Sequence, residues 1–216
     1  MTLRALPIIA ALIAAAPAAA QDLAGRYRLA DGPDVAGALE LGKDGTFGYE
    51  LAAGALDERA QGTWEMQDGA DRPRACLTTR PTPTPPEFQP AEPISGDGST
   101  IRVTWPPRPD GTLRGIAGID FTIGFDSGDP LTGYTQEDGW SMPPEERRIP
   151  RWIELIEPIH RITMARTPLH GRFRAVLMPN DLGVVNFQDA CFEAGEDGLF
   201  VLHRKEGDMK FRKAGK

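Results

Sequence analysis

Cys76 and Cys191 are the only two cysteines of this chain, and a cysteine pair can do redox, metal or cross-linking chemistry. An even cysteine count in an exported protein favours a structural disulfide, whereas in a reducing compartment the pair would be two buried thiols. There is no C-x-x-C spacing, so the sequence does not indicate an oxidoreductase. We expect a disulfide between two distant predicted strands and keep two separate buried thiols as the alternative.

Other catalytic and metal-binding patterns are scarce. The histidines are scattered without zinc-site spacing, and no serine lies in a G-x-S-x-G motif. The acidic segments DSGD and QEDG lack the ligand spacing of a calcium loop, because Gly128 stands where a second carboxylate is needed. The sequence therefore predicts no catalytic residue, no cofactor and no metal. A hydrolase with carboxylates drawn from separate strands stays as a further alternative.

The aromatic residues around GFDSGDPLTGYTQEDGW (124–140) are the remaining candidates for a site. An exposed tryptophan can stack on a sugar or a peptide, although aromatic side chains pack in cores more often. Asp-Gly turns explain the polar residues of this stretch, so we interpret it as a structural corner. The candidate ligand or partner contacts are Trp140, Tyr134 and Trp152.

The elements that must position these residues are predicted to be strands. Glycine and proline together make up 24 + 20 = 44 residues, and Asp-Gly occurs seven times. Asp-Gly between alternating apolar runs is a strong hairpin signal, because such turns require positive φ. No segment keeps a helical period, apart from one predicted short helical turn at 143–148. The predicted fold class is all-β.

The chain divides into five predicted segments. Residues 1–20 read as a signal peptide, 21–80 as an N-terminal β-meander, and 81–98 as a proline-rich linker rather than a strand. Residues 99–179 read as a β-sandwich, and 180–216 as hairpins that pair with the first meander. Neither end has enough strands to bury its apolar face alone, so we expect the two ends to form one barrel of roughly seven strands.

The passage PDGTLRGIAGIDFTIGFDSGDPLTGYTQEDGW resembles the carboxypeptidase regulatory-like modules, which are prealbumin-like β-sandwiches. The resemblance rests on Gly115 and Gly118 before a strand, followed by Thr135, Asp138 and Gly139. It covers about forty residues, and the long segment after Trp140 departs from the compact family core. It implies a sandwich that braces or presents something. The two chain ends, with their G-x-W and M-x-F-x-R patterns, weakly resemble small lipocalin-like barrels.

The charge of the chain limits its partners. The net charge is −7, and removal of Arg4 with the first twenty residues leaves 23 basic and 31 acidic side chains, a net of −8. Such a chain repels phosphate backbones, so general nucleic-acid binding is excluded. The basic segment 203–216 is interpreted as an edge strand guarded by lysine, with contact to an anionic surface as the alternative.

Three function classes follow from these observations. The first is a non-catalytic envelope protein, periplasmic or secreted, that binds or scaffolds an envelope protein or a glycan through its β-surface and loops. The second is a carrier of a small apolar ligand, which requires an open cavity lined by Leu39, Phe47, Trp64 and Leu199. An enzyme is the third. We predict no transmembrane segment, because the apolar run 5–16 is too short to span a bilayer.

We predict cleavage between Ala20 and Gln21. Arg4, the apolar run 5–16 and the small residues before Gln21 form the three parts of a secretory signal. N-terminal sequencing of protein from the native host should find Gln21 first. Retention of Met1 or Thr2 would contradict the prediction.

Overall fold

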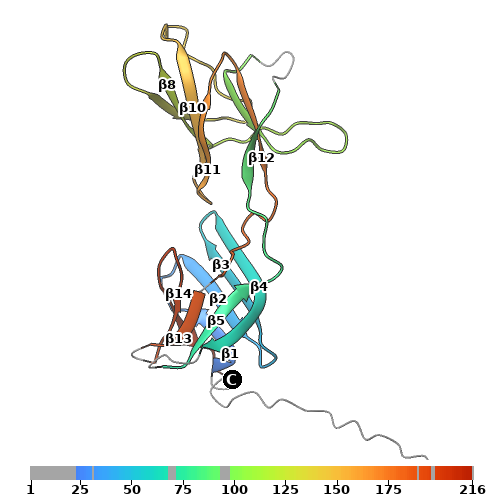
Figure 1. Ribbon diagram of the computed structural model, residues 1–216, viewed down its shortest axis with the longest axis vertical. Helices are drawn as coiled ribbons and strands as arrows, with labels where there is room; N and C mark the ends of the chain where they lie inside the picture. The colour runs from blue at the N-terminus through green and yellow to red at the C-terminus, as the bar shows by residue number, and fades with distance from the viewer. Residues whose placement is uncertain are drawn as a thin grey trace, which may run out of the picture. The chain divides into compact units, whose positions relative to one another are not determined.

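The computed structural model describes residues 23–30, 32–67, 72–92, 98–188, 190–195 and 198–215. Its regular structure is made of strands, which confirms the all-β prediction. The chain forms two compact units (Figure 1). One combines the chain up to Tyr49 with Gln61–Thr78 and Phe187–Lys216, and the other combines Glu50–Ala60 with Thr79–Asn186. Among the described residues, no helix has the length and apolar character needed to cross a bilayer.

Eight strands from both ends of the chain close into a barrel. Around the barrel each strand lies beside its neighbour in the chain, except that β15 closes the barrel against β1 and β5 lies beside β13. The residues between β5 and β13 therefore form an insertion between two paired strands. The barrel strands are β1 (Gly25–Leu29), β2 (Val35–Leu41), β3 (Thr46–Ala53), β4 (Leu56–Gln67), β5 (Arg74–Thr79), β13 (Ala190–Ala194), β14 (Phe200–His203) and β15 (Met209–Lys213).

Two strand pairings join the chain ends. Strand β13 runs antiparallel to β5 with Cys191 directly opposite Cys76, and the two cysteines form a disulfide, as the sequence predicted. Strand β15 pairs with both β1 and β14. The interpretation of the basic C-terminal segment as an edge strand is therefore wrong, because β15 is paired on both sides.

Side chains fill the barrel interior. The ring of Tyr27 packs edge-on against Phe192 and Phe200, with centroids 4.7 and 4.8 Å away, and its hydroxyl donates to the Leu23 carbonyl. Burial raises the pKa of Tyr27 to about 12. A second aromatic group joins Phe187 to Phe47 and to Tyr49. An eight-stranded barrel has room for such packing or for one small ligand.

The carrier alternative requires an open cavity whose walls water can reach. The expected walls were Leu39, Phe47, Trp64 and Leu199. The first three are only 1 %, 4 % and 6 % exposed, whereas Leu199 is half-buried. A cavity large enough for a ligand would leave its lining accessible to a water-sized sphere. Trp64 is also fixed in place, because its indole N–H donates to the Gly42 carbonyl at 2.9 Å. Leu39, Phe47 and Trp64 thus belong to a packed core.

The inserted unit is a sandwich of two sheets. One sheet has the order β11-β10-β8-β9, and the other has the order β6-β12-β7, with β7 parallel to β12. Their strands are β6 (Glu87–Pro90), β7 (Ile101–Thr104), β8 (Asp120–Phe125), β9 (Leu131–Tyr134), β10 (Pro150–Glu157), β11 (Ile162–Pro168) and β12 (Phe173–Met178).

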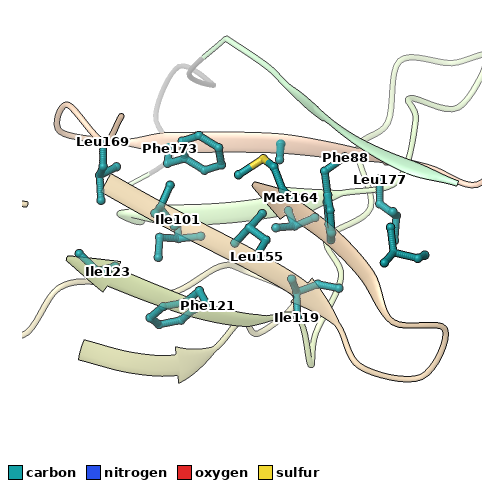
Figure 2. Close-up of a cluster of buried hydrophobic side chains, with 14 residues drawn as sticks. Phe88, Ile101, Ile119, Phe121, Ile123, Leu155, Met164, Leu169, Phe173 and Leu177 are labelled. Atoms are coloured by element: carbon teal, nitrogen blue, oxygen red, sulfur yellow. The ribbon is translucent and has the colours of Figure 1, made fainter. Parts of the chain in front are cut away.

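The two sheets bury one shared apolar core (Figure 2). Ile123 and Leu155 face it from the four-stranded sheet, and Ile101 and Phe173 face it from the three-stranded sheet. Alternate residues of each strand point inward, as period two requires. Each sheet therefore has one face buried against the other sheet, and the alternate side chains lie on its outer face.

The segment that leads into the sandwich differs from the sequence prediction. Residues 81–98 were predicted to be a linker without a strand, but Glu87–Pro90 forms β6, which pairs with β12 and buries Phe88. Proline is tolerated there because β6 is an edge strand and Pro90 is its last residue. Strand β11 pairs with β10 across the turn at 157–161.

Residues 143–148 form a single turn instead of the predicted helical turn. The Glu146 amide donates to the Pro143 carbonyl at 3.0 Å. The Glu146 carboxylate then accepts the amide and guanidinium of Arg148, and these bonds lower its pKa to about 2. Arg148 also stacks on Phe125 at 4.0 Å, so the segment is folded back by an ion pair and a ring contact.

Candidate functional site

A groove of about 530 Å³ lies on the sandwich beside the end of β7. It is an open depression with a polar rim, and it is bordered by one tryptophan, two arginines and two carboxylates. Its volume lies within the range of about 300 to 1,000 Å³ that is usual for ligand sites. Its lining residues are Arg102, Trp105, Leu113, Arg114, Gly115, Ile116, Ala117, Glu137 and Asp138.

A hairpin arm, residues 105–114, places Trp105 beside Arg114. The chain between β7 and β8 runs out as a long loop, drawn in yellow-green in Figure 1. It returns at the Asp110-Gly111 turn, so the Trp105 amide donates to the Arg114 carbonyl at 2.9 Å. The turn is fixed locally, because the Asp110 carboxylate accepts the Thr112 amide at 2.9 Å. Hydrogen bonds from Thr112 lower the pKa of Asp110.

The turn at 136–139 forms the acidic side of the groove. Gln136 and Gly139 exchange backbone hydrogen bonds, which leaves Glu137 and Asp138 at the tip of the turn. Gly139 has a φ of +95°, as the corner interpretation predicted. Gly115 permits the turn to lie against the arm, since a Cβ there would overlap the Glu137 carbonyl oxygen. The groove floor thus depends on the absence of a side chain at Gly115.

Thr135 ties this turn to the segment before β8. It is fully buried, its hydroxyl donates to the Ile116 carbonyl at 2.7 Å, and its amide donates to the Ile119 carbonyl at 2.9 Å. The Gly118 amide in turn donates to the Thr135 carbonyl. Gly118, Thr135 and Gly139 thus belong to hydrogen-bonded segments beside the groove, and Gly115 and Asp138 line it.

The groove combines both signs of charge with an aromatic ring. The guanidinium of Arg114 lies 6.0 Å from the centroid of the Trp105 ring, and Arg114 is exposed. Arg102 extends from β7 on the same side, and the exposed carboxylates of Glu137 and Asp138 face solvent from the turn. Such a site can donate charge-assisted hydrogen bonds to an anion and accept hydrogen bonds from hydroxyl or amide groups.

The three aromatic residues proposed from the sequence are not brought into one site. Trp140 is half-buried beside the core, and its ring packs against Phe121 with centroids 4.8 Å apart. Tyr134 is 60 % exposed and Trp152 half-buried, and strand alternation puts both on the outer face of the four-stranded sheet. The guanidinium of Arg166 covers the Trp152 ring at 3.6 Å.

Sequence reasoning missed Arg102, Trp105 and Arg114 as candidate site residues. The turn residues of the arm gave a signal for this pairing. A hairpin whose centre falls at the Pro109–Asp110 bond pairs residue 105 with residue 114 and residue 103 with residue 116, and both pairs are hydrogen-bonded in the structure. The approach of Glu137 to Gly115 could not be read from the sequence, because it depends on packing between segments far apart in the chain.

Comparison of the chain with protein-family models, with curated proteins and with solved structures found no significant match. The described part of the chain also contains no group of three or more His, Cys, Asp or Glu side chains placed to hold a metal ion. The function must therefore be argued from the groove itself.

We predict that Gly139→Ala destabilises the sandwich by more than Gly111→Ala does. Both glycines have positive φ, which costs an alanine about 1 kcal/mol. Only at Gly139 would the new Cβ also crowd other atoms, at 2.6 Å from the Ile101 carbonyl oxygen and from the Ser99 hydroxyl. Urea unfolding, monitored by tryptophan fluorescence, measures the free energy of unfolding of both variants. An unchanged stability of Gly139→Ala together with lost ligand binding would make this stretch a binding site instead of a corner.

Proposed function

We propose that this chain is an exported, non-catalytic binding protein whose sandwich carries the binding site. The observation that supports it is the groove, whose lining includes Trp105 together with two arginines and two acidic residues. Binding sites concentrate on loops held by a rigid scaffold. The arm and the turn at 136–139 are such loops, and the packed core beneath them is the scaffold.

The arrangement of the carboxylates favours binding over hydrolysis. A glycosidase places two carboxyl groups on opposite sides of the scissile bond. Glu137 and Asp138 are consecutive residues at the tip of one turn, and both are exposed. They approach a ligand from the same side. Their geometry suits hydrogen bonding to a ligand.

The barrel, in this proposal, is a filled support rather than a container. Three of its four expected cavity walls, Leu39, Phe47 and Trp64, are buried, and aromatic contacts occupy the interior around Tyr27 and Phe187. The apolar-carrier alternative would need these side chains to move apart. The resemblance of the sandwich to regulatory-like modules, which brace or present, agrees with a binding role.

Export is supported by two features. The first twenty residues have the three parts of a secretory signal. The Cys76–Cys191 disulfide is of the kind that persists in oxidising compartments. The expected partner is accordingly an envelope protein or a glycan.

The proposal predicts which residue of the full-length mature protein a bound ligand contacts. Soluble envelope oligosaccharides or peptides should shift the indole resonance of Trp105 in ¹⁵N spectra. Trp105→Ala should abolish binding, and the matched control Trp152→Ala, on the outer sheet face, should retain it.

A fluorescent apolar probe, N-phenyl-1-naphthylamine, tests the carrier alternative in parallel. We expect no saturable binding, because the barrel core is packed. Saturable binding with shifts at Leu39 and Phe47 would contradict the proposal and make the barrel the site.

A further inference from the structure

The groove presents its charges in two separate places. Arg102 and Arg114 lie on the side of β7 and the arm, whereas Glu137 and Asp138 lie on the 136–139 turn. A ligand that fits both places must carry an anionic group and also several hydrogen-bond donors. Trp105, half-buried at the end of β7, adds an aromatic surface.

We infer that the groove binds a carboxylated glycan, a chain of pyranose rings bearing carboxylate groups. This inference rests on the function proposed above. The exposed guanidinium of Arg114 can bind a carboxylate through paired N–H donors. The carboxylates of the turn accept hydrogen bonds from ring hydroxyls, and the apolar face of a pyranose packs on an aromatic ring.

The backbone around the groove favours a glycan over an extended peptide. Peptides commonly bind by adding a strand to a sheet edge, which requires unpaired main-chain groups. Here the amides of two lining residues are already used, because Trp105 donates to Arg114 and Ile116 donates to Val103 within the arm. This pairing of the arm with itself leaves side chains as its main groups for recognition. Side chains that donate to carboxylates and accept from hydroxyls match the surface of an acidic sugar.

The carboxylates also argue against polyphosphate ligands. Glu137 and Asp138 would repel a polyphosphate, which offers no hydroxyl donors to offset the repulsion, and the protein as a whole is acidic. An acidic sugar carries one charge per ring and offers hydroxyls between the charges. It can place its carboxylate near the arginines and its hydroxyls near the turn.

The test uses a matched pair of probes and the full-length mature protein. The probes are trigalacturonate and its methyl ester, which has the same rings without charge. Binding is measured by calorimetry and by ¹⁵N shifts of groove residues. We expect trigalacturonate to bind in the groove, and the ester to bind at least tenfold more weakly, because hydrogen bonds to a charged group are lost. Added salt should weaken only the charged probe.

Surface variants assign the effect to named side chains. Arg114→Gln should weaken trigalacturonate at least tenfold and leave the ester almost unaffected. Arg108→Gln, which removes the same charge from the same arm outside the groove, should change neither. Both positions are exposed, so these variants are expected to fold. Equal losses of affinity in the two variants would indicate that the overall electrostatic field of the arm attracts the ligand, and would overturn the assignment to Arg114.

The remaining outcomes separate this inference from the proposed function. Equal binding of the ester and the acid in the groove would overturn the carboxylate requirement while the groove stays a binding site. Groove binding of the acidic tripeptide Ala-Glu-Ala, with neither sugar bound, would overturn the glycan class alone. If no probe shifts a groove resonance, the inference fails. The proposed function then fails only if envelope oligosaccharides and peptides also leave the groove unperturbed.

Discussion

The pairing of β5 with β13 is the contact on which the architecture depends. It sets Cys76 opposite Cys191, and the disulfide fixes that register covalently. The chain before the insertion supplies five barrel strands, β1–β5, and the chain after it supplies three, β13–β15. Neither group can bury its apolar face alone. The cysteines are 115 residues apart in sequence. Cross-linking so long a loop restricts the unfolded chain and contributes about 4 to 5 kcal/mol in the chain-entropy model.

Local corners shape the groove within the insertion. The Asp110-Gly111 turn returns Arg114 to Trp105, and Thr135 holds the segment before β8 to the 136–139 turn. The charged side chains stand on these corners, while the core of the sandwich fixes the corners relative to one another. Structural glycines and side chains that line the groove thus lie along the same short segments. The stretch that reads as turn chemistry in sequence also shapes the site.

Local alternation made most strands predictable, and long-range packing limited the rest. The all-β class was predictable because Asp-Gly turns and apolar alternation, as in Arg74–Thr79, are local features of the sequence. Strand Glu87–Pro90 was missed because the prolines of the surrounding segment suggested a linker. Only its edge position beside β12 makes a strand feasible there. The groove was missed for the same reason, since nothing local predicts that Glu137 packs on Gly115. The disulfide was predictable from cysteine count and compartment.

Expression of residues 22–80 alone tests most directly whether the two chain ends depend on each other. The account predicts a fragment without cooperative unfolding, because β1–β5 would expose the apolar face that β13–β15 cover in the barrel. Co-expression with residues 186–216 should restore a cooperative thermal transition, measured by circular dichroism. A soluble 22–80 fragment that melts cooperatively by itself would show that the N-terminal strands need no partner, and it would contradict the account.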